Sequence, residues 1–327
     1  MPLVPLRPLM EAAEAHSYAQ GAFNVNAVAQ AKAVIEMHET FRSPAILQGA
    51  DLANAFMGGR VDFQNGTLED KKKGARNIAN AVKKYGENSP IPVVLHLDHG
   101  KDFDSCVAAI EGGYTSVMID GSKLSFEENI AVTRKVVEYA HDHGVMVEGE
   151  LGKLAGIEDA VNVSEADAQF TNPAEVEEFV SRTGVDSLAI AIGTSHGAYK
   201  FKPGQKPQLR FDILQQVSDR LPGFPIVLHG ASSVIQADVE TVNRFGGKMP
   251  DAIGIPEEML RHAAEMAVCK INIDSDLRLA MTAAIRQHMF EHPDHFDPRQ
   301  YLTPARDHIR ELVRHKMHDV LGCSGKA

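Results

Sequence analysis

Three histidines follow three separate apolar segments of the chain and together could bind a metal ion. His99 lies in LHLDHG, His196 in GTSHG, and His229 opens HGASS. Three neutral imidazoles that leave one coordination position open are the ligand set of a catalytic Zn²⁺ site. One such histidine alone is more often a hydrogen-bonded residue of the protein core. Three of them at equivalent positions favour a metal site.

Acidic residues accompany these histidines. Asp98 directly precedes His99, and Asp120 and Glu150 end two further apolar segments. Asp98 could act as an acid/base beside a Lewis-acid metal, or could orient a neighbouring ligand. Asp120 and Glu150 could supply oxygen ligands for a second metal position, or could pair with lysines across the fold. The residue types leave these alternatives open.

Small residues form turns after the same apolar segments, where backbone N–H groups are available to an anion. Residues of these turns are Gly197, Gly230, Ala231, Ser232, Asn272, Ile273, Asp274 and Ser275. Such turns are a common phosphate site on a barrel, especially after its seventh and eighth strands. Glycine-rich turns of this kind are also found as simple tight turns without a ligand.

Lys270 lies two and four residues before Asn272 and Asp274, so all three side chains share one face of a strand. A lysine inside a barrel could form a Schiff base with a carbonyl substrate. The alternative is a structural ion pair with a carboxylate, which we favour.

Eight short apolar segments predict buried parallel strands, and eight is the strand number of an α/β barrel. They are 21–25, 44–49, 92–97, 115–120, 145–150, 187–192, 225–229 and 268–273. Helical patterns alternate with them at 27–42, 102–112, 126–143, 173–183 and 211–220. The sequence therefore predicts a (β/α)₈ TIM barrel formed by 1–327 as a single catalytic domain, and the polar residues above fall at its strand ends.

Two segments are longer than this repeating unit needs, and a further one follows the eighth strand. Residues 51–90 contain polar turns and a Lys-rich helical pattern, and 151–172 is acidic without periodicity, which predicts a mobile loop over the site. A C-terminal helical extension is expected over about 276–327, with helices at 276–291 and 304–321.

Composition excludes several classes of protein. Hydrophobic residues make up 44% and charged residues 24% of the 327, with a formal net charge of -11, which disfavours nucleic acid and anionic membranes as partners. Three widely spaced cysteines suggest neither a disulfide scaffold nor a zinc-thiolate site. We find no signal-peptide pattern and no apolar segment of about 18 residues. These features predict a cytoplasmic protein.

Taken together, several motifs resemble the class II, zinc-dependent fructose-1,6-bisphosphate aldolases. They extend along nearly the whole chain: GAFNVN (21–26), LHLDHG (95–100), SVMID (116–120), VEGELG (147–152), AGIED (155–159), AIGTSHGAYK (191–200), VLHGASSV (227–234), CKINIDSD (269–276) and FDPRQYLTPARD (296–307). No single motif is diagnostic, but the set is highly specific.

The resemblance implies a lyase of glycolysis and gluconeogenesis that reversibly cleaves fructose 1,6-bisphosphate into dihydroxyacetone phosphate and glyceraldehyde 3-phosphate. It implies His99, His196 and His229 as ligands of the catalytic Zn²⁺, and Asp120 and Glu150 at a second divalent metal position. Asp98 matches the acid/base for the C4 hydroxyl, and Glu158 a loop glutamate for proton exchange. A monovalent cation and a homodimer or homotetramer also enter as expectations.

The same resemblance implies the substrate contacts. The turns described above match the dihydroxyacetone-phosphate site, Asn24 and Asn272 lie beside the reacting atoms, and Arg278 matches an arginine for the distal phosphate. Ala50 departs from the pattern, because many relatives have a serine there, and Asp51 beside a phosphate would be unfavourable unless it points away. Tagatose 1,6-bisphosphate or another ketose bisphosphate is therefore an alternative substrate.

Three other functions compete with this one. A Schiff-base aldolase would use Lys270 and resist chelators. A metallohydrolase or isomerase could use the same three histidines. A metal- and sugar-phosphate-binding protein without turnover would agree with the change at Ala50.

Overall fold

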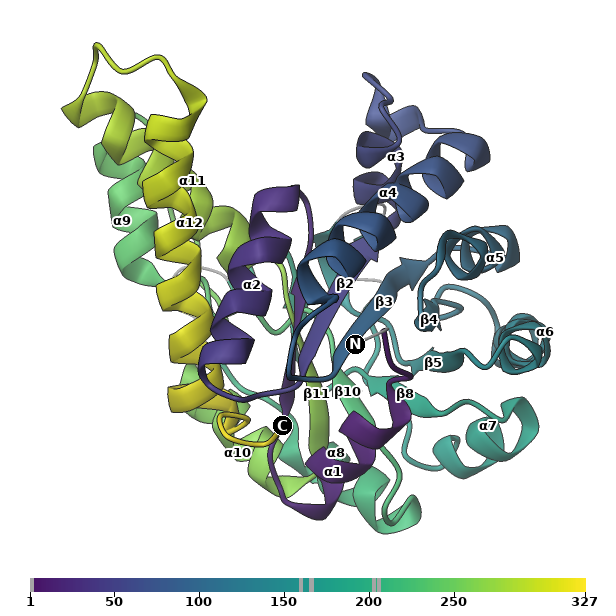
Figure 1. Cartoon of the computed structure of the whole chain (residues 1–327). Helices are drawn as coiled ribbons and strands as arrows, with labels where there is room; N and C mark the ends of the chain where they lie inside the picture. The colour runs from purple at the N-terminus through teal and green to yellow at the C-terminus, as the bar shows by residue number, and fades with distance from the viewer. Residues whose placement is uncertain (1–2, 159–160, 165–167, 202–203, 205–206) are drawn as a thin grey trace.

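Eight parallel strands close into a barrel in the computed structural model, in the order β1-β11-β10-β8-β5-β4-β3-β2 (Figure 1). The strands are β1 (Gln20–Asn24), β2 (Ala45–Ala50), β3 (Val93–Gly100), β4 (Ser116–Ile119), β5 (Met146–Leu151), β8 (Ser187–Ile190), β10 (Ile226–Leu228) and β11 (Val268–Ile273). Each overlaps one predicted strand, which confirms the TIM barrel. The structure describes residues 3–158, 161–164, 168–201, 204 and 207–327.

The barrel strands are buried on both faces, as expected where helices cover the outside of the barrel. Leu47, Leu95 and Val117 have no exposed surface, and they belong to one continuous hydrophobic core. Polar side chains on the same strands, such as Gln48 and Glu148, are also fully buried. Alternation along a strand thus separates an apolar layer under the helices from a polar barrel interior.

Twelve α-helices surround or extend the barrel in the described part of the chain. They are α1 (Arg7–Ala15), α2 (Val28–Thr40), α3 (Asp51–Met57), α4 (Leu68–Gly86), α5 (Phe103–Gly112), α6 (Phe126–Asp142), α7 (Val176–Thr183), α8 (Phe211–Arg220), α9 (Gln236–Arg244), α10 (Glu257–Met266), α11 (Ser275–Glu291) and α12 (Pro298–His315). A 3₁₀ turn, η1 (Phe63–Asn65), and a π-helix, η3 (Lys316–Leu321), complete them. The Lys-rich pattern in 51–90 is α4.

Local signals explain where several helices begin. Ser125 accepts a hydrogen bond from the Glu128 N–H and opens α6 with a capping box. Asp102 caps α5 in the same way, through the Ser105 N–H. These caps fix helix starts within one or two residues of the predicted ones.

The predicted absence of regular structure in 151–172 is wrong for part of that segment. Strands β6 (Ala155–Glu158) and β7 (Val161–Val163) form an antiparallel hairpin, and β6 also pairs with β9 (Ser195–His196). Gly156 permits this contact, because a Cβ there would lie 2.4 Å from the carbonyl oxygen of His196. A three-residue strand is too short to show periodicity, so tertiary pairing decides its structure.

The last long helix begins earlier than predicted. The sequence predicts a helix at 304–321, whereas α12 starts at Pro298 and is followed by η3. Asp297 caps α12 through the Arg299 N–H, and Pro298 occupies the first helical position, where no hydrogen-bond donor is needed. Pro304, at which the predicted helix starts, lies inside α12.

Helices α11 and α12 lie side by side and extend beyond the barrel with α9, and α3 and α4 project on another side (Figure 1). Among the described residues, no helix combines the length and the apolar character needed to cross a membrane.

Candidate metal centre

The three histidines predicted as metal ligands meet at the carboxyl ends of the barrel strands. The ring centroids of His99 and His229 are 4.5 Å apart, and those of His99 and His196 are 4.8 Å apart. All three side chains are buried. Asp98, His99 and His229 also offer ligand atoms that all lie within 4.8 Å of one another. Tertiary structure therefore brings together a donor set from β3, β9 and the end of β10.

The backbone of His99 explains how two consecutive residues face the same site. Successive side chains of a strand point to opposite faces, so Asp98 and His99 would normally diverge. His99 has a φ of +46°, in the left-handed region that a non-glycine residue rarely adopts. The pairing of β3 with β4 also shifts register between Leu97 and Gly100. This local turn brings both side chains to the barrel mouth, and such strain is typical of functional sites.

Glu148 determines the orientation of His229. The carboxylate lies 2.6 Å from Nε2 of His229, which therefore donates its proton to Glu148 and leaves Nδ1 as an acceptor. Asn272 Nδ2 donates to that Nδ1 over 2.9 Å. Glu148 was not among the site residues predicted from the sequence. The available signal was its position two residues before Glu150, on the same face of β5.

Lys270 forms the ion pair favoured from the sequence. Its ammonium lies 3.1 Å from Glu148 Oε2 and 2.7 Å from Asn272 Oδ1, with no surface exposed to solvent. Burial favours the neutral form of Glu148, but Lys270 and His229 hold the pKa of that carboxyl below its usual range. The lysine thus compensates a buried charge in the layer beneath the three histidines.

Asp98 is held between two asparagines. Its Oδ2 accepts a hydrogen bond from Asn24 Nδ2, and its Oδ1 accepts one from Asn272 Nδ2, each over 2.8 Å. Gln48 Nε2 in turn donates to Asn24 Oδ1 over 2.7 Å. Four strands therefore contribute to one network that fixes the carboxylate beside the histidines. Asn24 and Asn272, predicted as substrate contacts, both belong to it.

Asp120 and Glu150 meet on the other side of His99. Asp120 Oδ2 lies 3.1 Å from His99 Nδ1, Glu150 Oε2 lies 3.8 Å from it, and the three residues form a second possible ligand group. Burial opposes protonation of His99, but the bond to Asp120 and the charge of Asp98 raise its pKa to about 10. Burial, reinforced by Asp120, raises the pKa of Glu150.

The donor set fits a divalent metal. Within the described part of the chain, His99 Nε2 is buried without a hydrogen-bond partner, and so is Glu150 Oε2. An imidazole nitrogen left unpaired in the interior is costly unless something else binds it. Its location between Asp98 and the other histidines is where a metal would satisfy it. His99 would then coordinate through Nε2 while Nδ1 remains bonded to Asp120, as is usual for metal-bound histidines.

A buried network supports the glycine-rich turn after β10. Gly230 has a φ of +60°, and a Cβ there would lie 2.7 Å from the backbone of Ser195, so only glycine fits. Further along, Asp276 accepts hydrogen bonds from the N–H groups of Ser233 (2.9 Å) and Val234 (2.6 Å). Lys316 of η3 binds Asp276 Oδ2 at 2.9 Å.

The remaining predicted substrate residues surround this turn. Gly197 has a φ of +77°, and Ala231 and Ser232 are buried. Ile273 is also buried, and Asp274 accepts from Asn26 Nδ2 (2.7 Å) and Arg278 Nε (2.9 Å). Ser275 begins α11. Turns, helix start and arginine thus lie on connected segments of the barrel mouth.

The negative charge of Asp51, which follows Ala50, is neutralised by a lysine. Asp51 Oδ2 lies 2.6 Å from Lys71 Nζ and accepts from the Ser105 hydroxyl over 3.2 Å, and both Asp51 and Lys71 are buried. The Asp51 carboxylate is therefore bonded to residues of α4 and α5. Glu158 lies in β6, but its side chain is outside the part of the chain that the structure describes.

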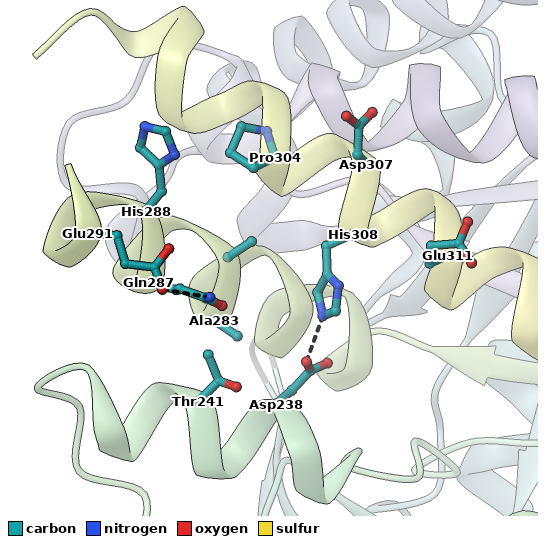
Figure 2. Close-up of a pocket in the computed structure, with 11 residues that line it drawn as sticks. Asp238, Thr241, Ala283, Gln287, His288, Glu291, Pro304, Asp307, His308 and Glu311 are labelled. Carbon is teal, nitrogen blue, oxygen red and sulfur yellow. Dashed lines mark hydrogen bonds and ion pairs between the residues drawn. The ribbon is translucent and has the colours of Figure 1, made fainter. Parts of the chain in front are cut away.

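A separate cavity of about 460 Å³ lies between α9, α11 and α12 (Figure 2). Its lining includes Asp238, Glu291, Asp307 and Glu311, and His308 donates to Asp238 over 2.6 Å. Carboxylates repel a phosphate, and among the described residues that line this cavity none is a predicted site residue.

Known proteins resemble this chain in sequence and in fold. Residues 4–326 match the model of the family described as fructose-bisphosphate aldolase class-II. A fructose-bisphosphate aldolase of Treponema pallidum (strain Nichols) is 50% identical, over 99% of this chain and 98% of that protein. One from Giardia intestinalis is 44% identical, over 100% and 95%. The crystal structure of the YdjI aldolase from Escherichia coli K12 superimposes with a TM-score of 0.74 at 29% identity, covering 99% of both chains.

Proposed function

The chain belongs to the class II fructose-bisphosphate aldolase family, and on that premise we propose that it reversibly cleaves fructose 1,6-bisphosphate into dihydroxyacetone phosphate and glyceraldehyde 3-phosphate. It is a lyase, and its family is metal-dependent. The observation that carries the proposal is the convergence of His99, His196 and His229 beside a carboxylate held by two asparagines.

The metal we propose is Zn²⁺, bound by His99, His196 and His229. Imidazole nitrogens suit zinc, and three such ligands leave a position open for substrate. Asp120 and Glu150, which lie close to His99, would supply ligands for a second divalent metal ion. When bound, the metal supplies Lewis-acid stabilisation of the negative charge that develops at the substrate carbonyl as the C3–C4 bond breaks. We also propose that a monovalent cation binds, on the resemblance to the family alone.

Asp98 would be the acid/base of the reaction. In cleavage it removes the proton of the C4 hydroxyl, the C4–O bond becomes a carbonyl, and the electrons of the C3–C4 bond pass to the donor fragment. Its two asparagine partners hold the carboxylate in place for this transfer. Asn272 Nδ2 contacts the Nδ1 of His229, and metal binding at that nitrogen would free the N–H to donate to the donor fragment. We assign Glu158 the proton exchange at C3.

The phosphate groups would bind at the turns. Gly197, Gly230, Ala231 and Ser232, with the segment from Asn272 to Ser275 at the start of α11, would receive the phosphate of the donor fragment through backbone N–H groups. Arg278 would receive the distal phosphate. Its guanidinium is about half exposed and binds Asp274, so it can turn toward a ligand. Ala50 would line the acceptor side, and its methyl group offers no hydroxyl to the substrate.

We also propose that the protein is cytoplasmic, that residues 1–327 act as one catalytic domain, and that it assembles as a homodimer or homotetramer. Support for assembly comes from the projecting α3–α4 region, where Phe56 is 52% and Val61 97% exposed. Apolar surface of this kind is common at contacts between subunits. Sedimentation analysis would report a dimer or larger, and a monomer at micromolar concentration would contradict this part.

The decisive experiment measures cleavage of fructose 1,6-bisphosphate by coupled detection of triose phosphate. We expect activity as purified, loss after EDTA, and recovery with Zn²⁺. Activity indifferent to EDTA would contradict the metal mechanism and revive a Schiff base on Lys270, which borohydride trapping would detect. Tagatose 1,6-bisphosphate, assayed in parallel, is expected to be the poorer substrate. If tagatose 1,6-bisphosphate were cleaved faster, it would be assigned as the substrate, and the type of reaction would stay the same.

A further inference from the structure

A second group of three histidines lies outside the barrel, where α11 ends. His288 is on the last turns of α11, His292 is its C-terminal cap, and His295 follows in the connection to α12. We propose that these three residues form a surface site for one divalent transition-metal ion, separate from the barrel site.

The rings are nearly as close to one another as those of the barrel site. Their centroids are 4.7 Å apart for His288 and His292, 5.1 Å for His288 and His295, and 4.8 Å for His292 and His295. The barrel trio has separations of 4.5 and 4.8 Å. Nε2 of His288 and Nδ1 of His295 lie 3.0 Å apart. Two imidazole nitrogens on one tetrahedral Zn²⁺ are about 3.3 Å apart, so a small rotation places both on one ion.

The backbone fixes this arrangement. The N–H of His292 donates to the carbonyl of His288, which keeps the two side chains one helical turn apart on the same face. Pro293 then ends the helix, and the N–H of His295 donates to the carbonyl of His292, which turns the chain back. The backbone therefore has little freedom left to lose on binding, and this lowers the cost of assembling the ligands.

The surroundings favour a cation. His288 lies at the edge of the cavity in Figure 2, whose lining carries four carboxylates and where Glu291 is oriented by Gln287 over 3.0 Å. The C-terminal end of a long helix also presents unpaired carbonyl groups, which attract positive charge. Three imidazoles select Zn²⁺, Ni²⁺ or Cu²⁺ over Mg²⁺ or Ca²⁺, which prefer oxygen ligands.

A bound ion would link the last turn of α11 to the connection that leads into α12. Ligation by residues on both sides of the turn would restrict opening of the α11–α12 hairpin. Because binding to the folded form alone stabilises it by mass action, the melting temperature should rise with metal concentration.

The test titrates Ni²⁺ into protein whose barrel site is already filled with Zn²⁺, using calorimetry and ICP analysis of bound metals. We expect one equivalent of Ni²⁺ to bind without displacing zinc. The H292N and H295N variants should bind it more than about tenfold more weakly, and H318N, at an exposed histidine outside the group, should bind it as the wild type does. All three substitutions are at exposed or half-buried positions, so the variants should fold.

Cu²⁺ bound at the same site should show ligation by three imidazole nitrogens in electron paramagnetic resonance of the wild type, and by fewer in H292N. Absence of an additional equivalent would contradict the proposal, as would binding that persists unchanged in both H292N and H295N. This test reads metal binding directly, so its outcome does not depend on whether the protein cleaves fructose 1,6-bisphosphate.

Discussion

The Glu148 carboxylate lies 2.6 Å from Nε2 of His229, and this contact decides which imidazole nitrogen faces the barrel mouth. Lys270 compensates the charge of the same carboxylate at 3.1 Å. A proposed metal ligand at the end of β10, the residue of β5 that orients it and a counter-charge from β11 are thus arranged together. Each can be removed separately, which makes their roles testable.

Replacing Glu148 by Gln should weaken zinc binding about 10- to 100-fold, because His229 loses its orienting acceptor and Lys270 loses its counter-charge. Competition with a chromogenic chelator measures the affinity. The double variant E148Q/K270M should recover thermal stability but not zinc affinity. E138Q, at an exposed glutamate of α6, is the matched control. Unchanged zinc affinity in E148Q would show that the contact has no role in metal binding.

Replacing Asp98 by Ala should lower kcat about 10²- to 10⁴-fold while zinc content stays near one equivalent, because the three histidines remain. Steady-state kinetics with parallel metal analysis separates the two effects. D142A, at an exposed aspartate of the α6 terminus, should behave as wild type. If D98A lost zinc in proportion to activity, Asp98 would be a ligand or its support instead of the acid/base.

Replacing Lys316 by Met should raise the KM for fructose 1,6-bisphosphate more than it lowers kcat. Lys316 lies 2.9 Å from Asp276, which holds the N–H groups of Ser233 and Val234 after the proposed phosphate turn. The change also leaves Asp276 and Glu257 without their shared cation, and should cost about 3 to 5 kcal/mol of stability.

The variant K316R should restore most of the lost affinity, because the positive charge returns. K123M, at an exposed lysine, is the control for loss of charge. A variant K316M that was destabilised but kept the wild-type KM would limit Lys316 to a structural role.

Replacing His38 by Leu should reduce the sensitivity of stability to acid. His38 is fully buried against Phe23, and burial lowers its pKa from 6.5 to about 4. Its folded pKa is below its unfolded value, so the unfolded state binds the proton first. Stability is therefore lost as pH falls from 6.5 toward 4, by about 3 kcal/mol at most.

Chemical denaturation at pH 7 and pH 4.5 measures this difference. Over that interval the wild type should lose more stability than H38L, and H16Q, at an exposed histidine, should follow the wild type. Equal losses in all three proteins would assign acid sensitivity to other groups.

The barrel and the chemical character of its mouth could be predicted from the amino-acid sequence. Apolar segments long enough for buried strands alternate with amphipathic helices, and this pattern is local, so it can be read without the fold. Polar residues at the ends of eight such strands must converge once the barrel closes, because the carboxyl ends of parallel strands share one rim. His99, His196 and His229 could therefore be placed together from the sequence.

The orientation of these side chains and the residues that support them depend on contacts between distant parts of the chain. Strand alternation predicts that Asp98 and His99 diverge, and the left-handed turn at His99 that reverses this is a local exception stabilised by its surroundings. The partners of Glu148 and Asp51 come from distant segments, Lys270 and Lys71, and no spacing in the sequence encodes such pairs. The β6–β7 hairpin likewise depends on pairing with β9. Interactions between distant segments are set by the packed chain as a whole, which local patterns do not contain.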